Sequence, residues 1–133
     1  MNRRRFLISS AAIVTGYRGA QAAPKVFHVG WLTAQRETSL TPFLEAFRAG
    51  LAEFGYRERE NLEIDYRYGD DNLLRVAPLA IELVRKPVDV LVVQGAAVGL
   101  VYELKLSTPA VYVFSGDPVV AGFADSLAHP RGI

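Results

Sequence analysis

Three short stretches of small and polar residues follow apolar runs, and their side chains have the chemistry to hold a ligand. Their residues are Thr33, Ala34, Gln35, Gly95, Ala96, Ser115 and Asp117. A glycine lets a ligand approach the backbone, hydroxyl and amide groups form uncharged hydrogen bonds, and a carboxylate pairs with an ammonium group. The free amides at the start of a helix after Gly95 can hold a carboxylate. The set favours a small polar ligand.

Asp117 is the only acid in this set, and it has two interpretations. Because Pro118 follows it, Asp117 fits the N-cap position of a helix that begins with proline. It can also pair with the ammonium group of a ligand. The two roles are compatible, since the carboxylate has two oxygens.

Residues 88–93 form the apolar run before Gly95 and predict the central strand. The run is nearly unbroken, with only Asp89 interrupting valine and leucine. A strand that is apolar on both faces has to be covered on both faces, which predicts a parallel sheet between helices. In such sheets ligands bind beyond the carboxyl ends of the strands.

The remaining patterns predict alternating strands and helices. Strands are expected at residues 26–32, 62–68, 88–93 and 110–114, and helices at residues 41–54, 73–85, 96–106 and 119–127. The alternation in residues 62–68 suits an edge strand. Right-handed crossovers then give an α/β fold, a doubly wound parallel sheet of flavodoxin-like order with the first and third strands adjacent at its centre. The three polar stretches would meet at one edge.

Two of these helices carry local signals. The first has Thr41 as a candidate N-cap, Gly55 as its stop and one apolar stripe: Leu40, Phe43, Leu44, Phe47, Leu51 and Phe54. The second has Leu73 among the residues expected to face the sheet. Pro78 requires that this helix is kinked or begins late.

Composition excludes several classes of function. The 133 residues suit one domain, and the absence of cysteine removes disulfides and thiolate chemistry. Four of the 15 basic residues lie in the first 22 positions, which leaves 11 against 14 acidic residues, the wrong sign for binding phosphates. No G-x-G-x-x-G or Walker A motif is present, and two histidines do not favour a triad or a metal cluster. We therefore expect no enzyme, no metal, no cofactor and no nucleic acid.

Residues 1–22 have the layout of an export signal. A basic start, Arg3-Arg4-Arg5, precedes an apolar stretch, and Ala20-Gln21-Ala22 matches a cleavage site. The order of Arg3, Arg4, Arg5, Phe6 and Leu7 resembles a twin-arginine signal. An ordinary secretory signal and a basic cytosolic tail are the alternatives. Either signal predicts a periplasmic protein cleaved near Ala22.

Several longer phrases resemble one family. They are Val29 to Leu32, Phe43 to Tyr56, Asn61 to Arg67 and Gly116 to Pro130. Together they resemble the N-terminal lobe of ABC-transporter substrate-binding proteins, in the branch that includes tryptophan and tyrosine uptake receptors. The resemblance covers the chain after the signal, residues 23–133.

The resemblance implies a lobe of the type I periplasmic-binding-protein fold. Such a receptor traps an amino acid or similar small polar solute between two lobes and delivers it to a membrane permease, and the three polar stretches match its cleft loops. Two departures stand out: Ala96 replaces a threonine or serine, and Pro130 to Ile133 stand where the family continues into a second lobe. We expect a monomeric first lobe whose second lobe is missing. A free-standing flavodoxin-like domain that binds a nucleotide or flavin, and a non-functional remnant, are the alternatives.

Overall fold

The computed structural model describes residues 25–128, and the predicted export signal and the last five residues lie outside that range. The elements are β1 (Phe27–Thr33), η1 (Glu37–Ser39), α1 (Thr41–Glu53), β2 (Leu62–Tyr68), η2 (Leu73–Arg75), α2 (Val76–Val84), β3 (Val90–Gln94), α3 (Ala97–Glu103) and β4 (Ala110–Val113). Helices η1 and η2 are 3-10 turns. Within residues 25–128, no helix has the length and apolar character needed to cross a membrane.

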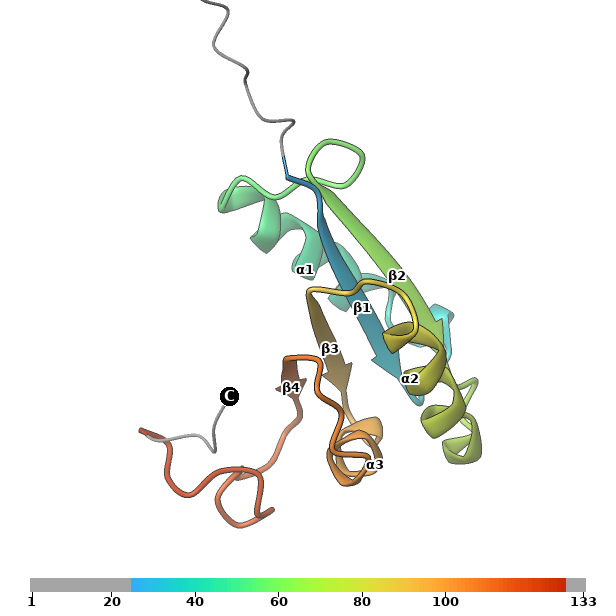
Figure 1. Ribbon diagram of the computed structural model, residues 1–133, viewed down its shortest axis with the longest axis vertical. Coiled ribbons are helices and arrows are strands. Elements are labelled where there is room, and N and C mark those ends of the chain that lie inside the picture. The colour runs from blue at the N-terminus through green and yellow to red at the C-terminus, as the bar shows by residue number, and fades with distance from the viewer. Residues whose placement is uncertain (1–24, 129–133) are drawn as a thin grey trace, which may run out of the picture.

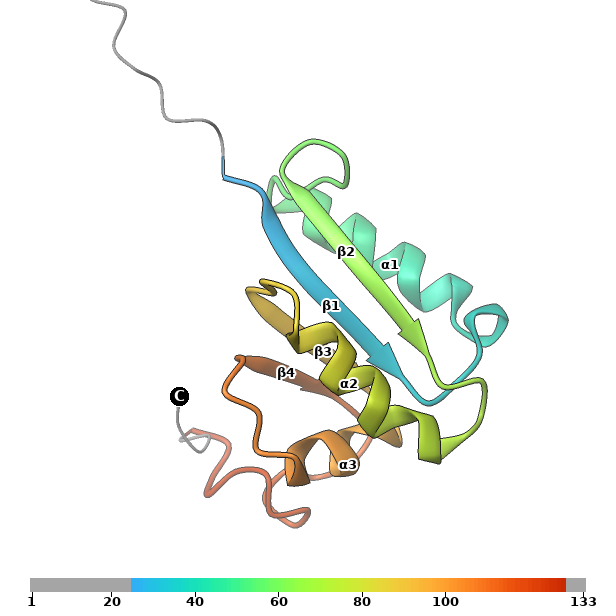
Figure 2. The same ribbon diagram turned by 45° about the vertical axis from the view of Figure 1, so that its right-hand side comes forward.

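The four strands form one parallel sheet in the order β2-β1-β3-β4. Strands β1 and β3 are adjacent at the centre and β2 lies at an edge, as the sequence predicts. Helix α1 lies on one side of the sheet, whereas α2 and α3 lie on the other (Figures 1 and 2). The predicted doubly wound α/β fold is confirmed.

The core divides between the two faces of the sheet. Against α2 and α3 lie Leu32 of β1 and Leu91 and Val93 of β3, all fully buried. Against α1 lie Val29 and Trp31 of β1, Val92 of β3 and the apolar positions of β2. Burial on both faces explains why the β3 sequence is continuously apolar.

The described residues cover only one of the two faces of strand β4. Ala110 and Tyr112 pack toward α3, but Val111 and Val113 are 53% and 45% exposed. Strand β4 thus differs from the central strand β3, because α1 lies over β1 and β2 and does not extend to it (Figures 1 and 2).

The boundaries of the first helix depart from the sequence prediction. Leu40, not Thr41, is the N-cap of α1, and no side chain caps it. Phe43 and Phe54 are 66% and 81% exposed, so they do not belong to the buried stripe. Phe43 lies in the first turn facing solvent, and Phe54 lies beyond the last helical residue. Gly55 ends the helix with φ +88°, as expected.

The second and third helices are shorter than predicted. Residues 73–75 form the turn η2 and α2 begins at Val76, which places Pro78 in the first turn, where its missing N–H costs no hydrogen bond. Leu73 is half exposed instead of facing the sheet. Helix α3 stops at Glu103, three residues before the predicted end.

The helix predicted at residues 119–127 is absent. One turn forms, in which the N–H of Ala121 donates to the carbonyl of Asp117, and then the N–H groups of Phe123 and Ala124 both donate to Pro118. Gly122 has a φ of +79°, a left-handed conformation that ends a helix. Two successive β-branched residues, Val119 and Val120, also weaken the helical preference.

Candidate functional site

The strand register brings the predicted ligand loops to one edge of the sheet. Tyr68, Thr33, Gln94 and Val113 lie side by side at the carboxyl ends of β2, β1, β3 and β4. The stretches beginning at Thr33, Gly95 and Ser115 therefore leave the sheet on the same edge. Parallel strands impose this arrangement, because all their carboxyl ends point the same way.

At the end of β1, Thr33 and Ala34 are buried, whereas Gln35 is exposed. The loop after β2 covers them: the N–H of Gly69 donates to the Thr33 carbonyl at 2.9 Å, and the N–H of Asp71 donates to the Ala34 carbonyl at 2.8 Å. Of the predicted residues in this stretch, only Gln35 has a side chain open to solvent.

Charged side chains hold the same two loops together. Arg36 pairs with Asp71 at 2.7 Å, and Arg75 pairs with Asp70. Asn72 caps η2 by accepting from the N–H of Leu74 at 3.0 Å. The Asp70–Asp71 pair thus stabilises loops, and no group of three or more potential metal ligands exists among residues 25–128.

A hydrogen-bond chain joins the ends of β1 and β3. The Thr33 hydroxyl donates to Gln94 Oε1 at 2.8 Å and accepts from the N–H of Gln35 at 3.2 Å. Thr33 therefore orders the neighbouring loops from beneath the surface, while the half-buried Gln94 reaches the edge.

At the end of β3, Gly95 makes the turn that the sequence predicts. Its φ is +68°, and its N–H donates to the Val113 carbonyl at 2.8 Å. Ala96 is exposed and offers no polar side-chain atom. The following helix, α3, has only seven residues, and the N–H of Val98 already donates to the Gly95 carbonyl at 3.1 Å. Its first turn thus offers fewer free amides than the sequence suggests.

At the end of β4, Ser115 and Asp117 are exposed. Asp117 Oδ1 accepts from the N–H of Val119 at 2.8 Å and of Val120 at 3.4 Å. The capping interpretation is confirmed, although Asp117 caps a single turn and not a helix. Its second oxygen, Oδ2, makes no hydrogen bond within residues 25–128 and can accept from a ligand.

Tyr68 adds a phenol beside this edge. Partial burial raises its pKa, and the nearby carboxylate of Glu37 raises it further, so the phenol stays protonated at neutral pH. Two residues back along β2, Tyr66 accepts from Arg48 and donates to Glu58. Burial chiefly raises the pKa of Tyr66 to about 12.

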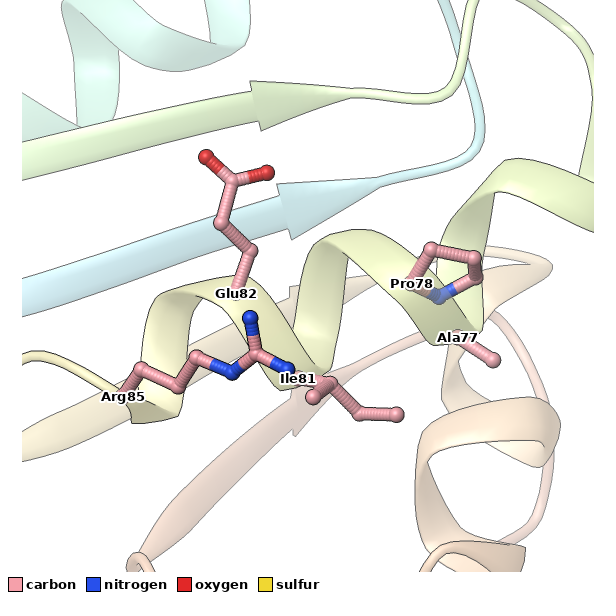
Figure 3. Close-up of a pocket in the computed structure, with 5 residues that line it drawn as sticks. All are labelled: Ala77, Pro78, Ile81, Glu82 and Arg85. Carbon is pink, nitrogen blue, oxygen red and sulfur yellow. The ribbon is translucent and has the colours of Figure 1, made fainter.

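Two surface hollows lie away from the loops. One runs along α2 and is lined by Ala77, Pro78, Ile81, Glu82 and Arg85 (Figure 3). The other lies near the amino ends of β1 and β2, where His28 Nδ1 is 3.2 Å from Glu63 Oε2. Neither hollow contains a predicted ligand residue.

Gln94 is the last residue of β3, one position beyond the predicted strand end, and it is not among the predicted ligand residues. Its only local signal is a polar residue that ends an apolar strand. The Arg36–Asp71 pair was also missed, because charged turn residues are common on any surface.

No protein-family model matches the chain, and no curated protein is significantly similar to it. Solved structures do match. A conserved domain protein from Vibrio cholerae O1 biovar El Tor is 26% identical with a TM-score of 0.68, over 77% of this chain and 35% of that one. The ABC domain in complex with L-Trp from Streptococcus pneumonia is 22% identical with a TM-score of 0.69, over 80% of this chain and 36% of that one.

A third similar structure is the ligand-free, open form of CD0873, a substrate binding protein with adhesive properties from Clostridium difficile. It is 19% identical with a TM-score of 0.65, over 77% of this chain and 35% of that one. The chain thus spans about a third of the length of the structures it matches. At the level of the fold, the resemblance found in the sequence is confirmed: residues 25–128 have the α/β fold of a periplasmic-binding-protein lobe.

Proposed function

We propose that this chain supplies the first lobe of the solute-binding component of an ABC uptake transporter, and that it binds an amino acid or a similar small polar solute without transforming it. The observation that carries the proposal is the convergence of three loops at one sheet edge. Gln35, Ser115 and Asp117 Oδ2 are the polar groups exposed there. A solute with both donors and acceptors suits this mixture.

A second lobe is needed for tight binding. The structures that the chain resembles are about three times as long as the part they share with it. An open surface leaves a small solute largely in water, whereas closure between two lobes buries most of it. We therefore propose weak binding by this lobe alone, and tight binding followed by transfer to a permease when a second lobe closes on a monomeric receptor.

An NMR titration tests the proposal on the full chain. We expect one or more of the twenty L-amino acids at millimolar concentration to shift the backbone amides of Gln35, Gly95 and Ser115. Asp117→Asn keeps an oxygen for the cap but loses the charge, and should weaken binding of the ammonium-bearing solute roughly tenfold, since a hydrogen bond to a charged group contributes about 1.5–3 kcal/mol.

Asp89→Asn is the matched control for that variant. Asp89 precedes β3, at the opposite end of the strand, and accepts from the N–H of His28 at 2.8 Å. Binding should be unchanged in this variant. If no amino acid shifts the edge, or if the purified protein carries a flavin or nucleotide, the proposal is wrong.

Export of the chain is a separate part of the proposal. The signal at residues 1–22 should direct the protein to the periplasm and be removed near Ala22. Replacing Arg3, Arg4 and Arg5 by lysine keeps the charge but removes the arginine pair. Cytoplasmic retention of this variant favours the twin-arginine route, and unchanged export favours the ordinary one.

A further inference from the structure

The side chain of Gln94 lies at the carboxyl edge, between the loops that follow β1 and β4. It lies between Thr33 of β1 and Val113 of β4 in the strand register. Its oxygen, Oε1, accepts from the Thr33 hydroxyl at 2.8 Å. Its nitrogen, Nε2, makes no hydrogen bond within residues 25–128 and is not among the buried polar atoms left without a partner there. Among the described residues, the amide nitrogen is therefore both unpaired and not enclosed by protein.

The orientation of the Gln94 amide follows from the donors and acceptors around the Thr33 hydroxyl. The Thr33 hydroxyl accepts from the N–H of Gln35, and its own single hydrogen also needs an acceptor. A carboxamide oxygen takes that hydrogen, whereas a carboxamide nitrogen does not. Thr33 is completely buried and has no water to donate to instead. The pairing therefore turns the two N–H groups of Gln94 away from Thr33.

We propose that Gln94 is the specificity-determining donor of this site, and that its Nε2 group hydrogen-bonds a carboxylate or carbonyl oxygen of the solute. Thr33 is then a positioning residue that acts through Gln94. This inference rests on the proposed function and narrows it to solutes that carry such an oxygen near their ammonium group.

Gln35 and Ser115 also expose donors at this edge, but of these three described residues only Gln94 has its donor group oriented by a side-chain hydrogen bond. Ala96 has no hydroxyl, and the N–H groups of Gly95 and Val98 are both taken by backbone carbonyls. The ionised carboxylate of Asp117 can only accept hydrogen bonds, so it cannot donate to a carboxylate. A carboxylate needs donors, and Gln94 supplies two N–H groups held in a fixed direction at the required place.

The test separates the carboxylate of the solute from the rest of it. Each L-amino acid that shifts the spectrum of the full chain is compared with its decarboxylated amine, for example L-tryptophan with tryptamine. We expect the amino acid to bind tenfold or more tightly than the amine, as a hydrogen bond to a charged group predicts. The side-chain ¹⁵N–¹H pair of Gln94 should shift with the amino acid and not with the amine.

Four variants assign the effect to the proposed atoms. Gln94→Leu and Thr33→Val should each lower the preference for the amino acid and leave the affinity for the amine unchanged. Gln94→Glu should lower the preference further, because a carboxylate repels a carboxylate. Thr33→Ser keeps the hydroxyl and should restore the preference, which also covers the case in which Thr33→Val does not fold.

The outcomes distinguish this inference from the function on which it rests. If an amino acid binds at the edge with the same preference in Gln94→Leu as in the wild type, the inference is wrong and the proposed function stands. The inference is also wrong if the variant weakens both probes equally, because that result indicates a structural role. If no amino acid binds at the edge, both are wrong.

Discussion

The two halves of the sheet differ in how completely they are covered. In the β1–β2 half, residues 27–84, α1 covers one face and α2 the other. In the β3–β4 half, residues 90–128, α3 covers one face, and Val111 and Val113 remain about half exposed on the other. No apolar strand residue of the first, closed half is exposed, whereas the second, open half presents two valines to solvent.

The loops at the carboxyl edge follow the same division. Backbone hydrogen bonds and the Arg36–Asp71 ion pair hold the loops after β1 and β2 against each other. The loops after β3 and β4 instead expose Ala96, Ser115 and Asp117. The difference teaches that the closed half positions the edge, while the open half offers most of the polar groups for a ligand. Gln94 lies where the two halves meet.

Matched valine truncations should give the largest difference between the halves. Val29 and Val111 lie on the same face of the sheet, but Val29 is 7% exposed and Val111 is 53% exposed. We expect Val29→Ala to lower the free energy of unfolding by about 1.5–3 kcal/mol, and Val111→Ala to change it by less than about 0.5 kcal/mol. Urea denaturation followed by the fluorescence of Trp31, the one tryptophan in the chain, measures both.

Equal losses in the free energy of unfolding for Val29→Ala and Val111→Ala would contradict the difference between the two halves. That result would mean that Val111 is covered in solution by something outside residues 25–128. Repeating the denaturation over a range of protein concentrations would then show whether a second copy provides the cover, since association makes the apparent stability depend on concentration.

Two glycines at the edge provide a second matched pair. A Cβ on Gly69 would lie 2.9 Å from the Ala34 carbonyl oxygen, so Gly69→Ala should cost about 1–3 kcal/mol by forcing the closed loops apart. A Cβ on Gly95 would meet no heavy atom within 4 Å, but its φ is +68°. Gly95→Ala should therefore cost about 1–2 kcal/mol through backbone strain alone.

Asparagine distinguishes the two causes. It tolerates the left-handed conformation, so Gly95→Asn should recover part of the stability lost in Gly95→Ala, whereas Gly69→Asn should be no better than Gly69→Ala. Thermal unfolding of the four variants measures the effect. Recovery at both positions would show that the loops after β1 and β2 are not tightly packed.

Most of the fold was predictable from local patterns. The alternation in residues 62–68 marks an edge strand, the apolar run before Gly95 marks a central one, and the handedness of crossovers fixes their order. The predicted helix at residues 119–127 failed because the left-handed conformation of Gly122 decides the outcome there. Phe54 was misassigned because it lies beyond the last residue of α1, and Phe43 because it lies in the first turn on the side that faces solvent.

The candidate site was predictable only in outline. Three polar stretches after three strands must share an edge, so their common position follows from topology. The burial of Thr33 and its hydrogen bond to Gln94 do not follow from topology. That contact joins residues 61 positions apart and depends on the register of β1 against β3. No short-range pattern carries that information.

The smallest expected effect is a response to acid confined to the closed half. Asp65 of β2 is partly buried, which would raise its pKa, but hydrogen bonds from Lys86 and Arg67 outweigh burial and lower the pKa below 3.8. The folded state thus releases this proton more readily than the unfolded state, so the stabilisation is complete above pH 3.8 and is lost as the pH falls through the folded pKa. Urea denaturation between pH 7 and pH 2.5 should show a shallower loss of stability in Asp65→Asn than in the wild type. Lys86→Met, which removes one of the two donors, should fall between them, and identical slopes in all three proteins would show that this ion-pair network does not stabilise the β1–β2 half.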